Sequence, residues 1–367
     1  MLRTKPPFRA DHVGSLLRSA MLKEARAKRE RGEIGADALH AVEDREIAAL
    51  IEKQEAAGLK SITDGEYRRA SWQTDFLVAL DGVESYMGER KFKFKGPQPR
   101  PILLRINKTL GGYTPHPMIE HFKFVRAHTK ATPKMTIPSP STLHFRYRRE
   151  AVPEVIYPSM DDFYRDLGTT YRKVVRAFAD AGCRYLQLDA VNFTYLCDPE
   201  LRRQVSARGD DPERLPHIYA DMINAAISDI PADMIITMHL CRGNFRSTFV
   251  ASGGYDAEAE VLFNRTNVHG YFMEYDSERA GGLEPLRLVP KGKIVVLGLV
   301  TTKTGQLESR DDLMRRIEAA AKFVDIDQLA LSPQCGFAST EEGNTLAEDE
   351  QWAKLRMIVD LAEEVWG

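Results

Sequence analysis

The feature that most constrains the fold is an alternation of short apolar runs with longer amphipathic stretches. Apolar runs of this length, separated by helical stretches, are typical of parallel strands that are buried on both faces. The predicted strands are residues 8–15, 59–63, 134–137, 185–191, 234–240, 270–275, 294–300 and 328–331. Eight such units in 367 residues favour an α/β fold of the (β/α)8 barrel type over a doubly wound sheet.

Helical periodicity fills most of the intervals between these strands. The predicted helices are residues 20–58, 161–181, 217–228, 310–323 and 348–365. Residues 82–130 do not fit the alternation, because KFKFKG and PILLRI are strand-like runs broken by Pro and Gly. They predict an inserted antiparallel excursion. Without an internal repeat or a glycine-rich phosphate loop, residues 1–367 are expected to form one barrel domain.

Composition excludes several classes of protein. A formal net charge of -2 argues against nucleic acid as a partner. No apolar run reaches the roughly 18 residues of a membrane span, and MLRTKPPFRADHVGSLL lacks the apolar core of a secretory signal. Four cysteines are too few for a disulfide framework in a chain of this length and fit a reducing compartment. We therefore expect a cytoplasmic enzyme with small-molecule substrates, and we leave a homo-oligomeric state open.

Polar residues follow several predicted strands, and four of them are potential metal ligands. His239 and Cys241 occur in MHLCRGN, Glu274 in YFMEYD and Cys335 in ALSPQCGF. Residues i and i+2 of a strand point the same way, and barrel strands end at one rim. One imidazole, two thiolates and one carboxylate suit tetrahedral zinc. An isolated H-x-C is common and free cysteine is usually a buried apolar residue, so the metal interpretation depends on all four side chains following strands.

These motifs, in this order, resemble those of a known family. HLCRGN, YFMEYD and SPQCGF are similar to the zinc-ligand motifs of cobalamin-independent methionine synthase. The resemblance covers nearly the whole chain and corresponds to the C-terminal catalytic barrel of that enzyme, without its N-terminal barrel. Single-barrel bacterial relatives are the best match. The resemblance implies that zinc is the cofactor and that His239, Cys241, Glu274 and Cys335 are its ligands.

The same resemblance implies a binding site for an amino-acid substrate. Gly14 and Ser15, in HVGSLL, match the family's glycine-serine pair that holds the substrate carboxylate. Glu66, in TDGEYRR, matches the glutamate that binds the amino group, and Asp189, in YLQLDAV, matches an aspartate near that group. These four residues are the predicted substrate-binding residues.

Two departures from the family concern the methyl donor. Full-length members carry a histidine after the seventh strand for proton transfer, where this chain has GLVTTKTG with Thr301. They also carry a tryptophan after the third strand that stacks on the pterin, where this chain offers only Phe145 and Tyr147. The resemblance therefore leaves the donor and the leaving-group acid unassigned. His12 and His144 are candidates for the acid, with a structural role favoured for both.

The expected function is zinc-dependent methylation of the homocysteine thiol to methionine, with a donor of the 5-methyltetrahydrofolate type or another methyl donor. An alternative is a different zinc thiol alkyltransferase, such as epoxyalkane:coenzyme M transferase. Coenzyme M ends in a sulfonate and has no ammonium, so Glu66 and Asp189 argue against it. A third interpretation is a non-catalytic barrel with purely structural zinc, whose four ligands would leave no access to substrate.

Overall fold

The main sheet of the protein consists of six parallel strands. The computed structural model describes residues 3–88 and 94–367. In spatial order the strands are β10 (Leu329–Pro333), β9 (Ile294–Val300), β8 (Gly270–Glu274), β7 (Ile235–Leu240), β6 (Tyr185–Asp189) and β5 (Met135–Pro138). Every neighbouring pair is parallel. Parallel strands place their carboxyl ends on one edge, where the predicted ligands lie.

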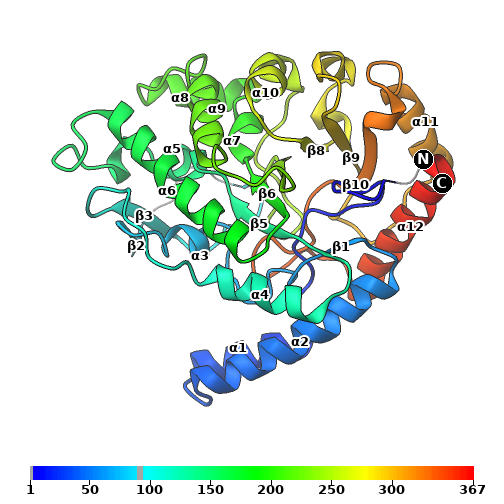
Figure 1. The fold of residues 1–367 in the computed structure, drawn as a ribbon, viewed down its shortest axis with the longest axis horizontal. Coiled ribbons are helices and arrows are strands. Elements are labelled where there is room, and N and C mark those ends of the chain that lie inside the picture. The colour runs from blue at the N-terminus through cyan, green and yellow to red at the C-terminus, as the bar shows by residue number, and fades with distance from the viewer. Residues whose placement is uncertain (1–2, 89–93) are drawn as a thin grey trace.

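Helices surround these strands (Figure 1). They are α1 (Ala20–Glu30), α2 (Ala36–Ala56), α3 (Thr74–Leu77), α4 (Met118–His128), α5 (Ser141–Tyr147), α6 (Met160–Asp180), α7 (Val191–Tyr195), α8 (Pro199–Ala207), α9 (Leu215–Ala226), α10 (Ala259–Arg265), α11 (Arg310–Ala320) and α12 (Glu348–Trp366). No helix formed by the described residues has the length and apolar character to cross a bilayer.

Parallel pairing continues beyond both edges of the main sheet. β4 (Thr132–Pro133) directly precedes β5 and pairs with β1 (Ser61–Ile62). At the other edge, Ala10 forms a parallel bridge with Leu331 of β10. Parallel pairing therefore extends from β1, through β4 and the strands of the main sheet, to the N-terminal segment.

Residues 8–15 form only that bridge, so the predicted first strand is wrong. The Asp11 carboxylate accepts hydrogen bonds from the backbone N–H groups of Phe8 and His12, at 3.1 and 2.8 Å. These side-chain bonds engage backbone donors that a strand would use in its ladder. Gly14 has a φ of +132°, which is outside the strand region.

Asp11 also anchors this segment inside the sheet. Its carboxylate lies 3.2 Å from Lys134 Nζ, with both side chains fully buried, and it accepts hydrogen bonds from Tyr185 and Ser61. Removing one partner of a buried ion pair leaves the other charge buried without compensation. Asp11 thus has a structural role, linking the N-terminal segment to β1, to β6 and to Lys134 between β4 and β5.

Two predicted segments differ from the structure. The predicted helix over residues 20–58 is two helices, α1 and α2, with a turn at residues 31–35 that includes Gly32 at a φ of +74°. The excursion over residues 82–130 is antiparallel only in β2 (Val83–Met87) and β3 (Ile102–Ile106). Its last part is the helix α4, whose apolar side chains pack into the core. Residues 89–93, which contain the start of KFKFKG, lie outside the described residues.

The two faces of the sheet pack against different clusters. On β8, Tyr271 and Met273 belong to the large hydrophobic cluster that includes the covering helices. Phe272 between them belongs to a small separate cluster with Val13, Val296 and Ala330. Alternate residues of a strand face opposite sides, so both faces of the sheet pack against apolar side chains.

Candidate metal centre and substrate cavity

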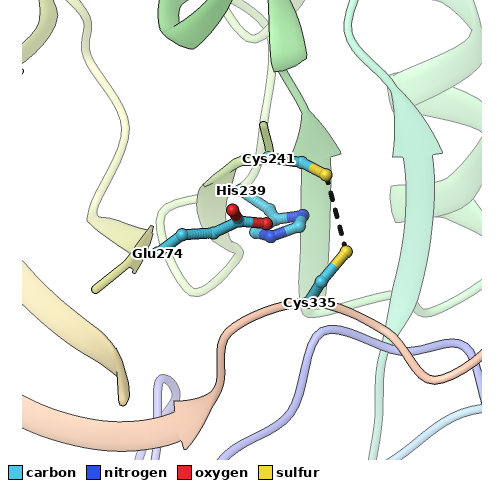
Figure 2. A group of neighbouring side chains, drawn as sticks. All are labelled: His239, Cys241, Glu274 and Cys335. Atoms are coloured by element: carbon cyan, nitrogen blue, oxygen red, sulfur yellow. Dashed lines mark hydrogen bonds between the residues drawn. The ribbon is translucent and has the colours of Figure 1, made fainter. Parts of the chain in front are cut away.

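Four potential metal ligands converge at the carboxyl ends of three strands. His239 lies in β7 and Cys241 directly after it, Glu274 is the last residue of β8, and Cys335 follows β10. One ligand atom from each side chain lies within 4.8 Å of all the others, and all four side chains are buried. Figure 2 shows the four side chains pointing toward one another.

The donor set fits a tetrahedral metal ion. Cys241 Sγ and Cys335 Sγ are 3.5 Å apart, and zinc–sulfur bonds of about 2.3 Å in a tetrahedron place two sulfurs about 3.8 Å apart. Glu274 Oε1 is buried without a hydrogen-bond partner among the described residues. An orphaned carboxylate oxygen next to two thiols is the arrangement that a divalent cation would satisfy.

Neighbouring side chains hold these ligands in orientation. Asp189 Oδ1 lies 3.4 Å from Nδ1 of His239 and is itself fixed by Gln187, at 2.8 Å. Burial alone lowers the pKa of His239, but the hydrogen bond with Asp189 and the nearby Cys335 raise it to about 9. A carboxylate on the second ring nitrogen is the usual support for a metal-binding histidine.

The two cluster thiols differ from the other two cysteines. The hydrogen bond between the two cluster thiols holds the pKa of Cys335 below its ordinary value and raises the pKa of Cys241 well above it. Cys241 Sγ also accepts a hydrogen bond from the backbone N–H of Gly243 at 3.2 Å. Cys183 and Cys197 instead donate to backbone carbonyls. Burial raises the pKa of both to about 12, so they remain protonated thiols, as expected for cysteines with a packing role.

The cluster borders a cavity that is partly open to solvent. His239, Cys241 and Cys335 line it, together with three of the predicted substrate-binding residues. Those three are Ser15, Glu66 and Asp189. The structure thus brings the predicted ligands and most of the predicted substrate residues to one site.

Gly14 supports this cavity without lining it. A Cβ at this position would lie 2.6 Å from Thr136 Cγ2, so only glycine allows the backbone to approach β5 this closely. Gly14 O accepts a hydrogen bond from Thr63 Oγ1 at 2.6 Å. These contacts fix the position of Ser15, the next residue.

Glu66 presents a carboxylate oxygen to the cavity. It has a φ of +60°, a backbone conformation that is costly for a residue with a side chain. Its Oε1 accepts from Thr136 and lies 3.4 Å from Arg69, while its Oε2 is buried and has no partner in the described part of the chain. Burial raises the pKa of Glu66 to about 7, against the opposing effect of Arg69.

The residues considered for the methyl donor lie elsewhere. His12, His144, Phe145, Tyr147 and Thr301 do not line the cavity. His12 Nε2 bonds to a backbone carbonyl, and the His144 ring bonds to two tyrosine hydroxyls. Both histidines are buried, and burial lowers the pKa of each to about 4. Neither is placed to protonate a leaving group in this cavity.

Sequence reasoning missed several cavity residues. They are Trp72, Gln73, Phe94, Arg146, Asn244 and Phe245. The available signal was position: Trp72 and Gln73 follow the DGEYRR motif by a few residues, and Asn244 and Phe245 directly follow HLCRG.

Comparisons with known proteins agree with this site. Residues 8–364 match the family described as cobalamin-independent synthase, catalytic domain. The uncharacterised protein YxjH of Bacillus subtilis is 49% identical over 99% of this chain and 96% of that protein. The 5-methyltetrahydropteroyltriglutamate–homocysteine methyltransferase of Bacillus velezensis is 21% identical over 96% of this chain, but over only 42% of its own length.

Solved structures show the same fold. A crystal structure of a candidate vitamin-B12-independent methionine synthase from Listeria monocytogenes is 41% identical, covers 100% of both chains and has a TM-score of 0.79. A B12-independent methionine synthase from Shewanella, in complex with selenomethionine, gives a TM-score of 0.72 at 19% identity over 97% of both chains.

The fold is of the α/β class, and a buried cluster of four potential metal ligands lies at the carboxyl ends of its strands. This chain belongs to the cobalamin-independent methionine synthase family, whose members are methyltransferases, and it carries the family's catalytic domain.

Proposed function

We propose that the protein binds zinc through His239, Cys241, Glu274 and Cys335 and methylates the thiol of homocysteine, forming methionine. The observation that carries the proposal is one cavity that is lined both by the cluster and by Glu66, whose Oε2 has no hydrogen-bond partner among the described residues. A thiol near the ligands and an ammonium near Glu66 are the two ends of an amino-acid thiol such as homocysteine.

Zinc bound in this cluster would keep the substrate sulfur in its thiolate form at neutral pH. The residues of the chain supply binding and orientation. Glu66 accepts from the ammonium, whose charge favours the ionised carboxylate over the protonated form. Ser15 Oγ donates to the substrate carboxylate, and Asp189 supports both the ammonium and the His239 ring.

The reaction balances as a displacement at carbon. The thiol loses its proton, its sulfur forms a bond to the methyl carbon, and the bond between that carbon and the donor breaks. The demethylated donor leaves with the electron pair of that bond, and the proton released by the thiol passes to it or to solvent. Holding sulfur and methyl carbon in line within one cavity removes much of the entropic cost of their encounter.

The alternatives fit the cavity less well. A coenzyme M substrate would place a sulfonate where Glu66 has an unpaired oxygen, and repulsion would weaken its binding. A purely structural zinc site would be closed, whereas three of the four ligands line a cavity. Both observations favour an amino-acid thiol as the substrate.

We infer that the strands close into a (β/α)8 barrel and that residues 1–367 form one domain. Support comes from parallel pairing beyond both edges of the sheet and from the bonds that Asp11 makes to Lys134, Ser61 and Tyr185. The family match over residues 8–364 is consistent with one domain. A reducing, cytoplasmic location is supported by four free cysteines.

Metal content and zinc-edge X-ray absorption, with and without homocysteine, test the function. We expect one zinc per chain and an additional sulfur neighbour when homocysteine is added. Cys335→Ser is expected to lose zinc and activity, whereas Cys183→Ser, at a buried cysteine outside the cluster, retains both. Absence of zinc, or a zinc shell that is indifferent to homocysteine, contradicts the proposal.

A further inference from the structure

Glu274 uses only one of its two carboxylate oxygens within the protein. Its Oε2 accepts a hydrogen bond from Arg279 Nη2 at 3.2 Å, whereas its Oε1 is buried and has no partner among residues 3–88 and 94–367. The side chain is 0% exposed, and a buried acceptor is normally paired. Oε1 is therefore left for a ligand that the chain itself does not supply.

Arg279 is held in place from several directions. Its Nη2 also donates to Asp276 Oδ1 at 2.9 Å, and its Nε donates to Ser277 Oγ at 3.1 Å. Its guanidinium carbon lies 4.7 Å from the centroid of the Phe249 ring, and its backbone oxygen accepts from Gly253 N–H at 2.8 Å. Only 10% of the side chain is exposed. The guanidinium therefore has a fixed position and little contact with water.

The second carboxylate at this guanidinium is already satisfied. Asp276 Oδ1 accepts from Arg279, and Asp276 Oδ2 accepts from Thr301 Oγ1 at 3.1 Å. Asp276 thus has a partner for each oxygen, whereas Glu274 has a partner for Oε2 alone. The difference makes Arg279 a structural partner of Asp276 and gives it a further role at Glu274.

That role concerns the number of oxygens that Glu274 can offer. A carboxylate binds a metal ion through one oxygen or through both. Through one oxygen, Glu274 completes a set of four donors with His239, Cys241 and Cys335, the number that zinc prefers. Through both, it would take a position beside the ion that a substrate sulfur needs. A charge-assisted hydrogen bond from a fixed guanidinium holds Oε2 away from that position.

We propose that Arg279 is a positioning residue that restricts Glu274 to binding the metal ion through one oxygen, and so keeps a coordination position available to the homocysteine sulfur. The assignment rests on the proposed function and adds a residue that is not among the described residues lining the cavity. Without the guanidinium, Oε2 loses its partner and turns toward the ion as an additional donor. Homocysteine then binds more weakly.

Visible absorption of the cobalt-substituted protein tests the assignment, because the spectrum of Co²⁺ reports its coordination geometry. Tetrahedral Co²⁺ absorbs severalfold more strongly than the five-coordinate ion. We expect an intense tetrahedral spectrum for the wild type and a severalfold weaker one for Arg279→Met, which has a long side chain without donors. Arg279→Lys restores a cation and should recover part of the intensity, which a loss of packing would not. Arg202→Met breaks an arginine pair with Glu258 outside the cluster and should keep the wild-type spectrum.

Homocysteine titration of the zinc-loaded proteins provides a second readout. Binding should weaken by about tenfold or more in Arg279→Met and stay unchanged in Arg202→Met. If Arg279→Met does not fold, the double variant with Asp276→Asn replaces it, because that variant also removes the second carboxylate that Arg279 neutralises.

The outcomes separate this assignment from the proposed function. A folded, metal-loaded Arg279→Met protein with the wild-type spectrum, or with the wild-type affinity for homocysteine, overturns the assignment. A wild type whose cobalt spectrum is five-coordinate overturns it as well. A wild type that binds neither zinc nor cobalt instead rejects the proposed function.

Discussion

Gly336→Ala tests the position of the substrate carboxylate more directly than substitution of one of the four proposed metal-ligating side chains. A Cβ at residue 336 would lie 1.9 Å from Ser15 Oγ and 3.1 Å from Ser15 Cβ. The two backbones cannot separate easily, because Phe337 N–H donates to Ser15 O at 2.9 Å and Asn244 holds Gly336 O. The cheapest response is rotation of the Ser15 hydroxyl out of the cavity.

The magnitude follows from the hydrogen bond that this rotation removes. A hydrogen bond to a charged group contributes about 1.5–3 kcal/mol, so homocysteine should bind roughly 10- to 100-fold more weakly. Titration calorimetry with homocysteine measures the change, and zinc content should stay at the wild-type level because no ligand is altered.

Ser15→Ala provides the matched control. It removes the same hydroxyl and should weaken homocysteine binding by a similar factor. The double variant Ser15→Ala with Gly336→Ala should bind no more weakly than Ser15→Ala alone, because the new methyl group then has no hydroxyl to displace. Wild-type affinity in Gly336→Ala, or additive losses in the double variant, would refute the proposed role of Ser15.

Three further predictions concern metal, packing and pH. A chelator should lower the melting temperature of the wild type by a few degrees but not that of Cys335→Ser. A ligand present at 100 times its Kd adds about 2.7 kcal/mol to the free energy of unfolding. Equal shifts in both proteins would place the metal elsewhere. Arg242→Lys should cost about 2–4 kcal/mol in urea unfolding, because Arg242 is buried and donates to four oxygens, including the carbonyl that ends β8. Burial lowers the pKa of His12, His116 and His144 to about 4 from 6.5. The unfolded chain therefore binds protons that the folded protein does not, so the free energy of unfolding is highest above pH 6.5 and falls as the pH drops toward 4. In that window His144→Gln should reduce the slope of unfolding free energy against pH by up to about 1.4 kcal/mol per unit, and an unchanged slope would contradict the burial argument.

The convergence of the four potential ligands was predictable because its signal is local. His239, Cys241, Glu274 and Cys335 each end an apolar run or directly follow one, and parallel strands bring such positions to one edge. The pairing of β7, β8, β9 and β10 in chain order then fixes their proximity. Nothing beyond strand assignment and chain order was needed to place the four side chains together.

The side of the cavity that Trp72 and Gln73 line was not predictable, because long-range contacts position it. Trp72 and Gln73 lie in a loop whose position depends on Ser339 and Thr340, far away in the sequence. The first predicted strand failed for a related reason, since the Asp11 side chain takes backbone donors that apolar periodicity assigns to a ladder. Local patterns describe elements well but not the loops that tertiary contacts position.

The bridge between the N-terminal segment and β10 has a consequence for synthesis of the protein in the cell. Arg9 donates to Leu329 O across 320 residues of chain, and its guanidinium also lies over Trp366. At roughly 5–20 residues per second, a ribosome takes between a quarter of a minute and a minute to deliver that partner. Ser15 and Glu66 emerge early, and Cys335 emerges among the last tenth of the chain. The nascent protein therefore cannot bring the four cluster residues together before residue 335 has been synthesised, and residues 8–15 remain without the β10 strand until then.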